Sequence, residues 1–157
     1  MPEQLYKPPV MPERTLSAGR AIALATFFAA LLLFFHATST SAQVTGSTHG
    51  PWTSRSGELQ VSYASHLDPL TINQIHSWVL YLETNEGAPV ADAELTVQGG
   101  MPEHDHGLPT RPRVTRYLGD GKYLLEGMRF HMPGAWEIQV AVDMPGKQDV
   151  VVISLTL

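Results

Sequence analysis

From residue 58 onward the chain alternates hydrophobic and polar positions in short segments of strand length. Alternate residues of a β-strand point to opposite faces of a sheet, so this period of two predicts strands with one buried face. Turn residues such as Gly119-Asp120-Gly121 and Met144-Pro145-Gly146-Lys147 separate the segments. The segments are marked by Leu59, Val61 and Tyr63; Trp78, Leu80 and Leu82; Ala91, Ala93, Leu95 and Val97; Val114 to Tyr117; Tyr123 and Leu125; Trp136, Ile138, Val140 and Val142; and Val151, Ile153, Leu155 and Leu157.

This succession of about seven strands without a helical period predicts an all-β domain. Strands at such regular spacing over roughly 100 residues are typical of an immunoglobulin-like antiparallel β-sandwich. The segment around Trp78 is apolar on both faces, because Ile75, Val79 and Tyr81 oppose it, and this favours a central strand. Residues 43–57 are instead rich in Gly, Ser and Thr, which predicts a flexible linker ahead of a β-sandwich domain at 58–157.

Residues 1–42 form a targeting segment. The unbroken apolar run 21–35 follows Lys7, Arg14 and Arg20 and precedes small polar residues that end at Ala42. A basic region, an apolar stretch and a small-residue cleavage site are the parts of a secretory signal, so we expect an N-terminal hydrophobic helix that is a signal peptide or a membrane anchor.

Two alternatives stay open for this segment. The run is shorter than the ~20 residues of a spanning helix, which favours cleavage after Ala42. The twenty residues before the run favour a retained anchor helix, unless Met11 rather than Met1 is the start. Either way we expect an exported domain, periplasmic or anchored in the inner membrane through residues 21–35.

Composition narrows the classes of function. The chain has no cysteine, which excludes disulfides, thiolate metal sites and a thiol nucleophile. A net charge of −5 argues against nucleic-acid binding, which needs a basic surface. There is no G-x-S-x-G elbow and no H-E-x-x-H helix, so we expect a protein that is not an enzyme.

The chemistry-bearing stretch is Gly99 to Thr110, where Met101, His104 and His106 lie among glycines and prolines. Thioether sulfur and imidazole nitrogen suit copper when thiolates are absent. In an extended segment His104 and His106 would face the same way and could bind one ion. The opposing interpretation is a turn-rich loop in which both histidines are solvated and the methionine packs against the sandwich.

Two further residues complete the candidate metal site. His76 shares the strand face of Trp78 and is either a core-edge histidine or a third nitrogen ligand. Met132 follows His131, and its side chain either fills space in the hydrophobic core or provides a thioether ligand. Mixed His and Met ligands suit Cu(I), and imidazoles alone suit Cu(II) or zinc. The candidate ligands are therefore His104, His106, Met101, His76 and Met132.

An ordered series of short motifs runs from Asn73 to Trp136. The motifs are Asn73, His76-Ser77-Trp78, Gly99-Gly100-Met101-Pro102, His104-Asp105-His106-Gly107-Leu108-Pro109-Thr110, Gly121-Lys122-Tyr123, Gly127-Met128-Arg129-Phe130, Met132-Pro133-Gly134 and Trp136. This series resembles the YtkA-like/FixH-like family. The resemblance implies a small extracytoplasmic β-sandwich behind a signal or anchor. The FixH branch is associated with copper-dependent haem oxidase assembly, so the resemblance also implies such a membrane-protein system as partner.

Two hypotheses follow. The first is an exported or tethered β-sandwich that binds a copper ion through its Met/His loop, in metal handling or respiratory oxidase assembly. The alternative is a metal-free extracytoplasmic interaction module, in which the Gly/Pro/His loop is a structural clamp or a docking surface.

Overall fold

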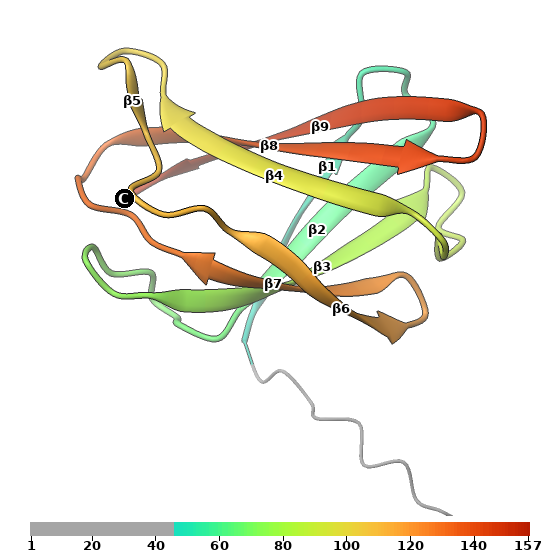
Figure 1. The fold of residues 1–157 in the computed structure, drawn as a ribbon, viewed down its shortest axis with the longest axis horizontal. Coiled ribbons are helices and arrows are strands. Elements are labelled where there is room, and N and C mark those ends of the chain that lie inside the picture. Colours follow the sequence, from blue (N-terminus) through green and yellow to red (C-terminus); the bar gives the residue numbers. More distant parts are fainter. Residues whose placement is uncertain (1–45) are drawn as a thin grey trace, which may run out of the picture. The chain divides into compact units, whose positions relative to one another are not determined.

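The computed structural model describes residues 46–157, which form an all-β domain of two antiparallel sheets (Figure 1). The five-stranded sheet has the order β1-β2-β3-β7-β6, and the four-stranded sheet has the order β5-β4-β8-β9. The strands are β1 Thr48–Thr53, β2 Leu59–Ser65, β3 His76–Thr84, β4 Glu94–Met101, β5 His106–Gly107, β6 Arg113–Gly119, β7 Lys122–Met128, β8 Ala135–Met144 and β9 Lys147–Thr156. Over residues 46–157 there is no helix with the length and apolar character needed to cross a membrane.

The core consists of side chains that the alternating pattern places on the inner faces of the two sheets. Trp78 on β3 and Trp136 on β8 are its largest fully buried members, and one comes from each sheet. Along β8 buried and exposed residues alternate strictly, as expected for a strand with one solvated face. The predicted all-β fold is therefore confirmed. The buried hydrophobic residues that form the core cluster are Leu59, Val61, Tyr63, Trp78, Leu80, Leu82, Leu95, Val97, Met101, Tyr123, Leu125, Met128, Phe130, Trp136, Ile138, Val140, Val142, Val151 and Ile153.

The structure corrects the predicted start of the folded domain. Strand β1 lies inside residues 43–57, which were predicted to be a flexible linker, and it pairs antiparallel with β2. It is an edge strand whose residues are exposed except for the half-buried Trp52, so it has no buried face to produce an apolar period. The predicted signal or anchor helix in 1–42 lies outside the described residues.

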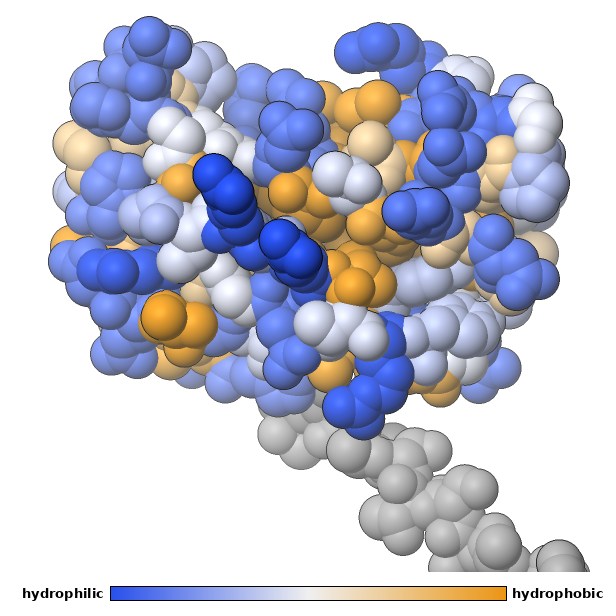
Figure 2. All heavy atoms as spheres, in the orientation of Figure 1, coloured by the Kyte–Doolittle hydropathy of each residue, from blue (hydrophilic) through white to orange (hydrophobic). Residues whose placement is uncertain are grey.

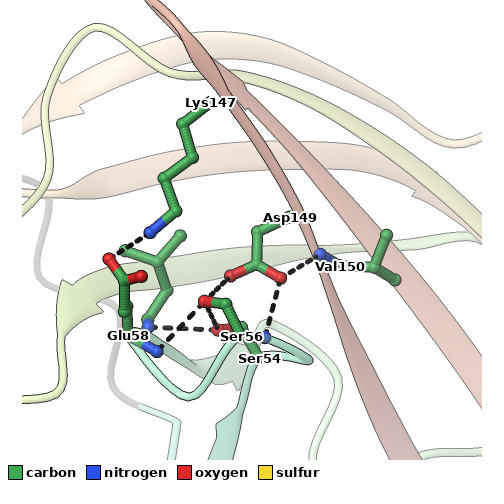
Figure 3. Close-up of polar contacts among 7 residues, drawn as sticks. Ser54, Ser56, Glu58, Lys147, Asp149 and Val150 are labelled. Carbon is green, nitrogen blue, oxygen red and sulfur yellow. Dashed lines mark hydrogen bonds and ion pairs between the residues drawn. The ribbon is translucent and has the colours of Figure 1, made fainter.

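A buried carboxylate joins the β1–β2 turn to strand β9 (Figure 3). The Asp149 carboxylate accepts hydrogen bonds from Ser56 Oγ at 2.5 Å, from Ser56 N at 3.2 Å and from Val150 N at 2.9 Å. Burial alone would raise the pKa of this carboxyl, but the hydrogen bonds from Ser56, Ser54 and Val150 outweigh it and lower the pKa from 3.8 to about 2. An ion pair between Lys147 and Glu58 connects the same two regions at the surface.

We expect Asp149→Asn to destabilise the domain by about 2 kcal/mol at neutral pH, because one pKa unit corresponds to about 1.4 kcal/mol. The folded-state pKa is depressed, so the stabilisation is fully present above pH 3.8 and is lost as the pH falls toward about 2. Urea unfolding of the wild type and the variant should thus show a difference that shrinks with acidification. Asp143→Asn, at an exposed aspartate, should change the unfolding free energy by less than about 0.5 kcal/mol; an equal effect of both variants would contradict the assignment.

Candidate functional site

The topology gathers the loop after β4 and the loop between β7 and β8 at one end of the domain (Figure 1). Strand β8 runs antiparallel to β4, with Gly100 opposite Glu137, so the end of β4 lies beside the beginning of β8. Residues 129–134, which lead into β8, are therefore neighbours of the β4–β5 hairpin. This hairpin carries the predicted Met/His loop, and hydrophilic residues cover much of the corner of the domain that it occupies (Figure 2).

The hairpin brings His104 and His106 side by side. The amide of His104 donates to the Met101 carbonyl at 3.1 Å, which closes a turn, and Asp105 has a positive φ of 52°. The two imidazole rings lie nearly parallel, 21° apart, with centroids separated by 6.4 Å. The expected proximity of the pair is present, although a turn rather than an extended segment produces it.

Two glycines at the end of β4 allow the returning segment, from His106 to Leu108, to pack closely against this strand. A Cβ at Gly99 would lie 2.4 Å from Ile138 Cδ1 and 3.0 Å from Leu108 Cδ1, so the missing side chain makes room for both residues. A Cβ at Gly100 would lie 2.8 Å from the His106 carbonyl oxygen. The Leu108 amide then donates to the Gly99 carbonyl at 2.9 Å. The Gly-Gly pair is therefore a packing requirement of the loop.

We expect Gly100→Ala to destabilise the domain by about 1–3 kcal/mol, because its new methyl group meets backbone that must shift. Gly107→Ala is the matched control: Gly107 lies opposite Gly100 in the hairpin, and its added Cβ would make only an ordinary contact at 3.7 Å. Urea unfolding measures both, and faster hydrogen exchange at the Leu108 amide should accompany only the first. Equal unfolding free energies of the two variants would show that the hairpin backbone can shift to admit a methyl group at position 100 without loss of stability.

The methionines lie on the core side of this region. Met101 is 2% exposed, and a Cβ at Gly134 would lie 2.8 Å from its Cε, so its methyl group sits beneath the β7–β8 loop. Met132 is partly buried and packs against the core, and its carbonyl accepts a hydrogen bond from Trp136 Nε1 at 3.1 Å. Both predicted thioether ligands thus have packing roles, and their metal-binding role stays a prediction.

His76 lies at the start of β3, as predicted, and its side chain is buried. Its Nδ1 contacts the Gln74 carbonyl at 3.1 Å, and its ring neighbours are Trp78 at 6.2 Å and Phe130 at 5.8 Å. Burial lowers the pKa of this imidazole, and the hydrogen bond to Gln74 opposes that effect. Its ring contacts are with core aromatics, so the structure gives it the surroundings of a core-edge histidine; its role as a ligand stays a prediction.

His131 lies beside the Met/His loop, although the sequence did not place it among the candidate ligands. Its ring centroid lies 6.1 Å from that of His106 and 5.5 Å from that of Trp136. The row His104–His106–His131 is therefore continuous, although β4–β5 and the β7–β8 loop are distant in sequence. The sequence carries one signal for His131, which directly precedes the candidate ligand Met132.

The geometry of the row is open. Within residues 46–157 no three His, Asp or Glu side chains are already arranged around a common metal position. What the residues do provide is a pair of exposed imidazoles, His104 and His106, on a hairpin whose backbone is fixed by close packing. Imidazoles of this kind are ligands for copper and zinc.

Fold and site together define a small all-β domain of two antiparallel sheets with a Met/His-bearing hairpin at one end. The YtkA-like family model matches residues 58–141, more than half of the chain, and the protein belongs to this family. No curated protein and no solved structure matches the chain.

Proposed function

We propose that this protein is an exported or membrane-tethered YtkA-like domain that binds a copper ion through the β4–β5 hairpin and serves metal handling or respiratory oxidase assembly. His104 and His106 are the primary ligands. Met101, His76 and Met132 are the further candidates that the sequence suggested, and they are subject to the same test.

One observation carries the proposal: the stacked imidazoles of His104 and His106, with ring centroids 6.4 Å apart on a hairpin of fixed shape. A nitrogen–metal bond is about 2 Å long, so two rings that share an ion have centroids at most about 6 Å apart. The two rings are slightly farther apart than this limit, and both side chains are exposed, so binding requires them to rotate toward a common ion. In a chain without cysteine, imidazole and thioether are the donors that favour copper over hard cations.

The proposed location outside the cytoplasm rests on the expected targeting segment. Residues 1–42 would carry the domain to the extracytoplasmic side, either as a cleaved signal or as an anchor through 21–35. An exported copper-binding domain fits a membrane-protein partner such as a copper-dependent oxidase assembly system. An immunoglobulin-like arrangement of the two sheets is part of the same proposal.

A second function is supported by the glycine packing of the hairpin. Contacts of Gly99 and Gly100 with Ile138, Leu108 and the His106 backbone fix the loop without a metal. A loop held in this way can also be a structural clamp or a docking surface for a protein partner. Partner capture that requires the hairpin and survives a chelator would favour this metal-free interaction module.

The decisive test is a copper titration of the full-length chain in mild detergent, in competition with chelators of known affinity. We expect one equivalent of copper to bind with sub-micromolar affinity. Binding no tighter than nonspecific background in both oxidation states would overturn the proposal and leave the interaction module.

A further inference from the structure

The β2–β3 loop, residues 66–75, exposes two isoleucines to solvent. Ile75 is 69% exposed, the largest value for any large hydrophobic side chain in residues 46–157, and Ile72 is 42% exposed. From Pro69 to Ile75 the loop contains no Asp, Glu, Lys or Arg. An exposed apolar segment without charges is typical of a surface that binds another protein or a membrane.

Hydrogen bonds fix the shape of this loop. Asn73 lies between the two isoleucines, and its amide donates to the Phe130 carbonyl at 2.6 Å. Its Oδ1 accepts a hydrogen bond from Arg129 Nη2 at 3.2 Å. At the start of the loop Ser65 Oγ donates to the Leu67 carbonyl at 2.8 Å. The isoleucines are therefore held out by a structured loop, and docking costs little conformational entropy.

The chain enters the folded domain beside this loop. Thr48 pairs with Ala64 near the end of β2, and β2 leads directly into the loop (Figure 1). A Cβ at Gly46 would lie 2.4 Å from the Ser65 carbonyl oxygen, so the entering chain contacts the last residue of β2. Residues 36–45 separate the apolar run 21–35 from Gly46. A segment of this length spans at most about 35 Å when fully extended, so an anchor through 21–35 would keep the loop within that distance of the bilayer.

The charges around the loop fit a lipid surface. Arg129, which is partly exposed, adds a cation beside the isoleucines, and cations favour a surface with anionic headgroups. Asp68 precedes the uncharged stretch, and its exposed side chain can stay in water when the loop docks. The apolar tip thus has a polar margin, as a segment at a membrane interface requires.

We propose that the β2–β3 loop docks on the lipid bilayer, with Ile72 and Ile75 inserted at the boundary between headgroups and acyl chains. This inference rests on the tethered form of the proposed function and does not require copper. Arg129 and Phe130, which bind the loop, belong to the β7–β8 connection beside the β4–β5 hairpin. Docking would therefore keep the Met/His hairpin at the end of the domain that faces the membrane, where a membrane-protein partner can meet it.

The test uses the full-length chain in liposomes of phosphatidylcholine and phosphatidylglycerol. Because the chain has no cysteine, one introduced cysteine carries a polarity-sensitive fluorophore at a single position. Thr71→Cys places the label beside Ile72, and Glu86→Cys is the matched control, in an exposed turn beyond the far end of β3. The nine residues of β3 separate the two labels by about 26 Å. We expect a blue shift, and quenching by nitroxide lipids labelled near the headgroup, at position 71 only.

A double variant tests the isoleucines themselves. In the Thr71→Cys background, Ile72→Ser/Ile75→Ser should lower the ratio of docked to undocked loops by about tenfold or more, because each isoleucine removed from water favours docking. Leu118→Ser/Val152→Ser is the matched control, since these side chains are 42% and 36% exposed on other strands, and it should leave the quenching unchanged. Near-ultraviolet circular dichroism verifies that each variant is folded.

Three outcomes would overturn the inference. The first is equal quenching at positions 71 and 86, and the second is quenching at position 71 that persists without the isoleucines. Absence of quenching in these protein-free bilayers would be the third, and it would leave a protein partner as the occupant of the loop. Failure of the chain to float with the liposomes would also overturn it, because the tethered form would then be absent. The copper titration in detergent is independent of docking, so its failure would overturn the copper site alone.

Discussion

Replacement of His104 and His106 together by alanine is expected to lower the copper affinity of the full-length chain by about a hundredfold or more. Loss of a residue that merely orients a metal ligand costs about 10–100-fold in affinity, so loss of two ligands should exceed that range. Both side chains are exposed, and the unfolding free energy should therefore change by less than about 0.5 kcal/mol. Competitive copper titration measures the affinity, and urea unfolding measures the stability.

The matched control for this experiment is the double substitution His49→Ala/His66→Ala. These histidines are also exposed, but His49 stacks on Tyr63 and His66 contacts Ser77, outside the row of imidazoles. The control removes the same number of imidazoles from the chain and should leave copper binding unchanged. An equal loss in both double variants would mean that copper binds to surface histidines without a defined site.

Trp136→Ala is expected to destabilise the domain by about 3–5 kcal/mol, the usual result of truncating a fully buried large aromatic residue. Trp136 is 1% exposed and begins the buried face of β8. Its ring packs edge-on against Phe130, with centroids 5.2 Å apart, and its Nε1 donates to the Met132 carbonyl at 3.1 Å. The truncation therefore leaves a cavity and also removes the hydrogen bond that holds the β7–β8 loop.

Urea unfolding of the full-length chain measures this effect, with Trp52→Ala as the matched control. Trp52 is the same residue type on the edge strand β1, half-buried and stacked on Tyr63 with centroids 5.8 Å apart. Its loss should cost about 1 kcal/mol, the worth of an aromatic pair. Similar effects at both positions would show that the core beside the β7–β8 loop is no more important for stability than the sheet edge.

The fold could be predicted from the sequence wherever one strand face is buried. Residues such as Ile138 and Val140 on β8 repeat every second position because they fill the space between the sheets. Strand β1 gave no such signal because both of its faces are largely exposed, and β5 is only two residues long. Ile75 is 69% exposed and precedes β3, so the apolar pattern there extended beyond the strand.

The candidate site could be predicted only where its residues are close in sequence. The spacing of His104 and His106 predicts that they lie together, and the structure places their rings side by side. His131 comes from another strand connection, and its proximity to His106 depends on the pairing of β4 with β8. A periodic pattern shows which residues are buried but not which strands are neighbours, so this contact was not predictable from the pattern.

The β4–β5 hairpin has a further consequence for solubility. Strand β4 would otherwise be the edge of the four-stranded sheet, with free backbone amides and carbonyls that could pair with another chain. The two residues of β5 pair with Gly100 and Met101 at the end of β4, and the following Leu108 amide bonds to Gly99. Pro102, Glu103 and Asp105 make the turn itself a poor template for another strand. The segment that presents the histidines to solvent thus also covers the last residues of this edge, from Gly99 to Met101, against pairing with another strand.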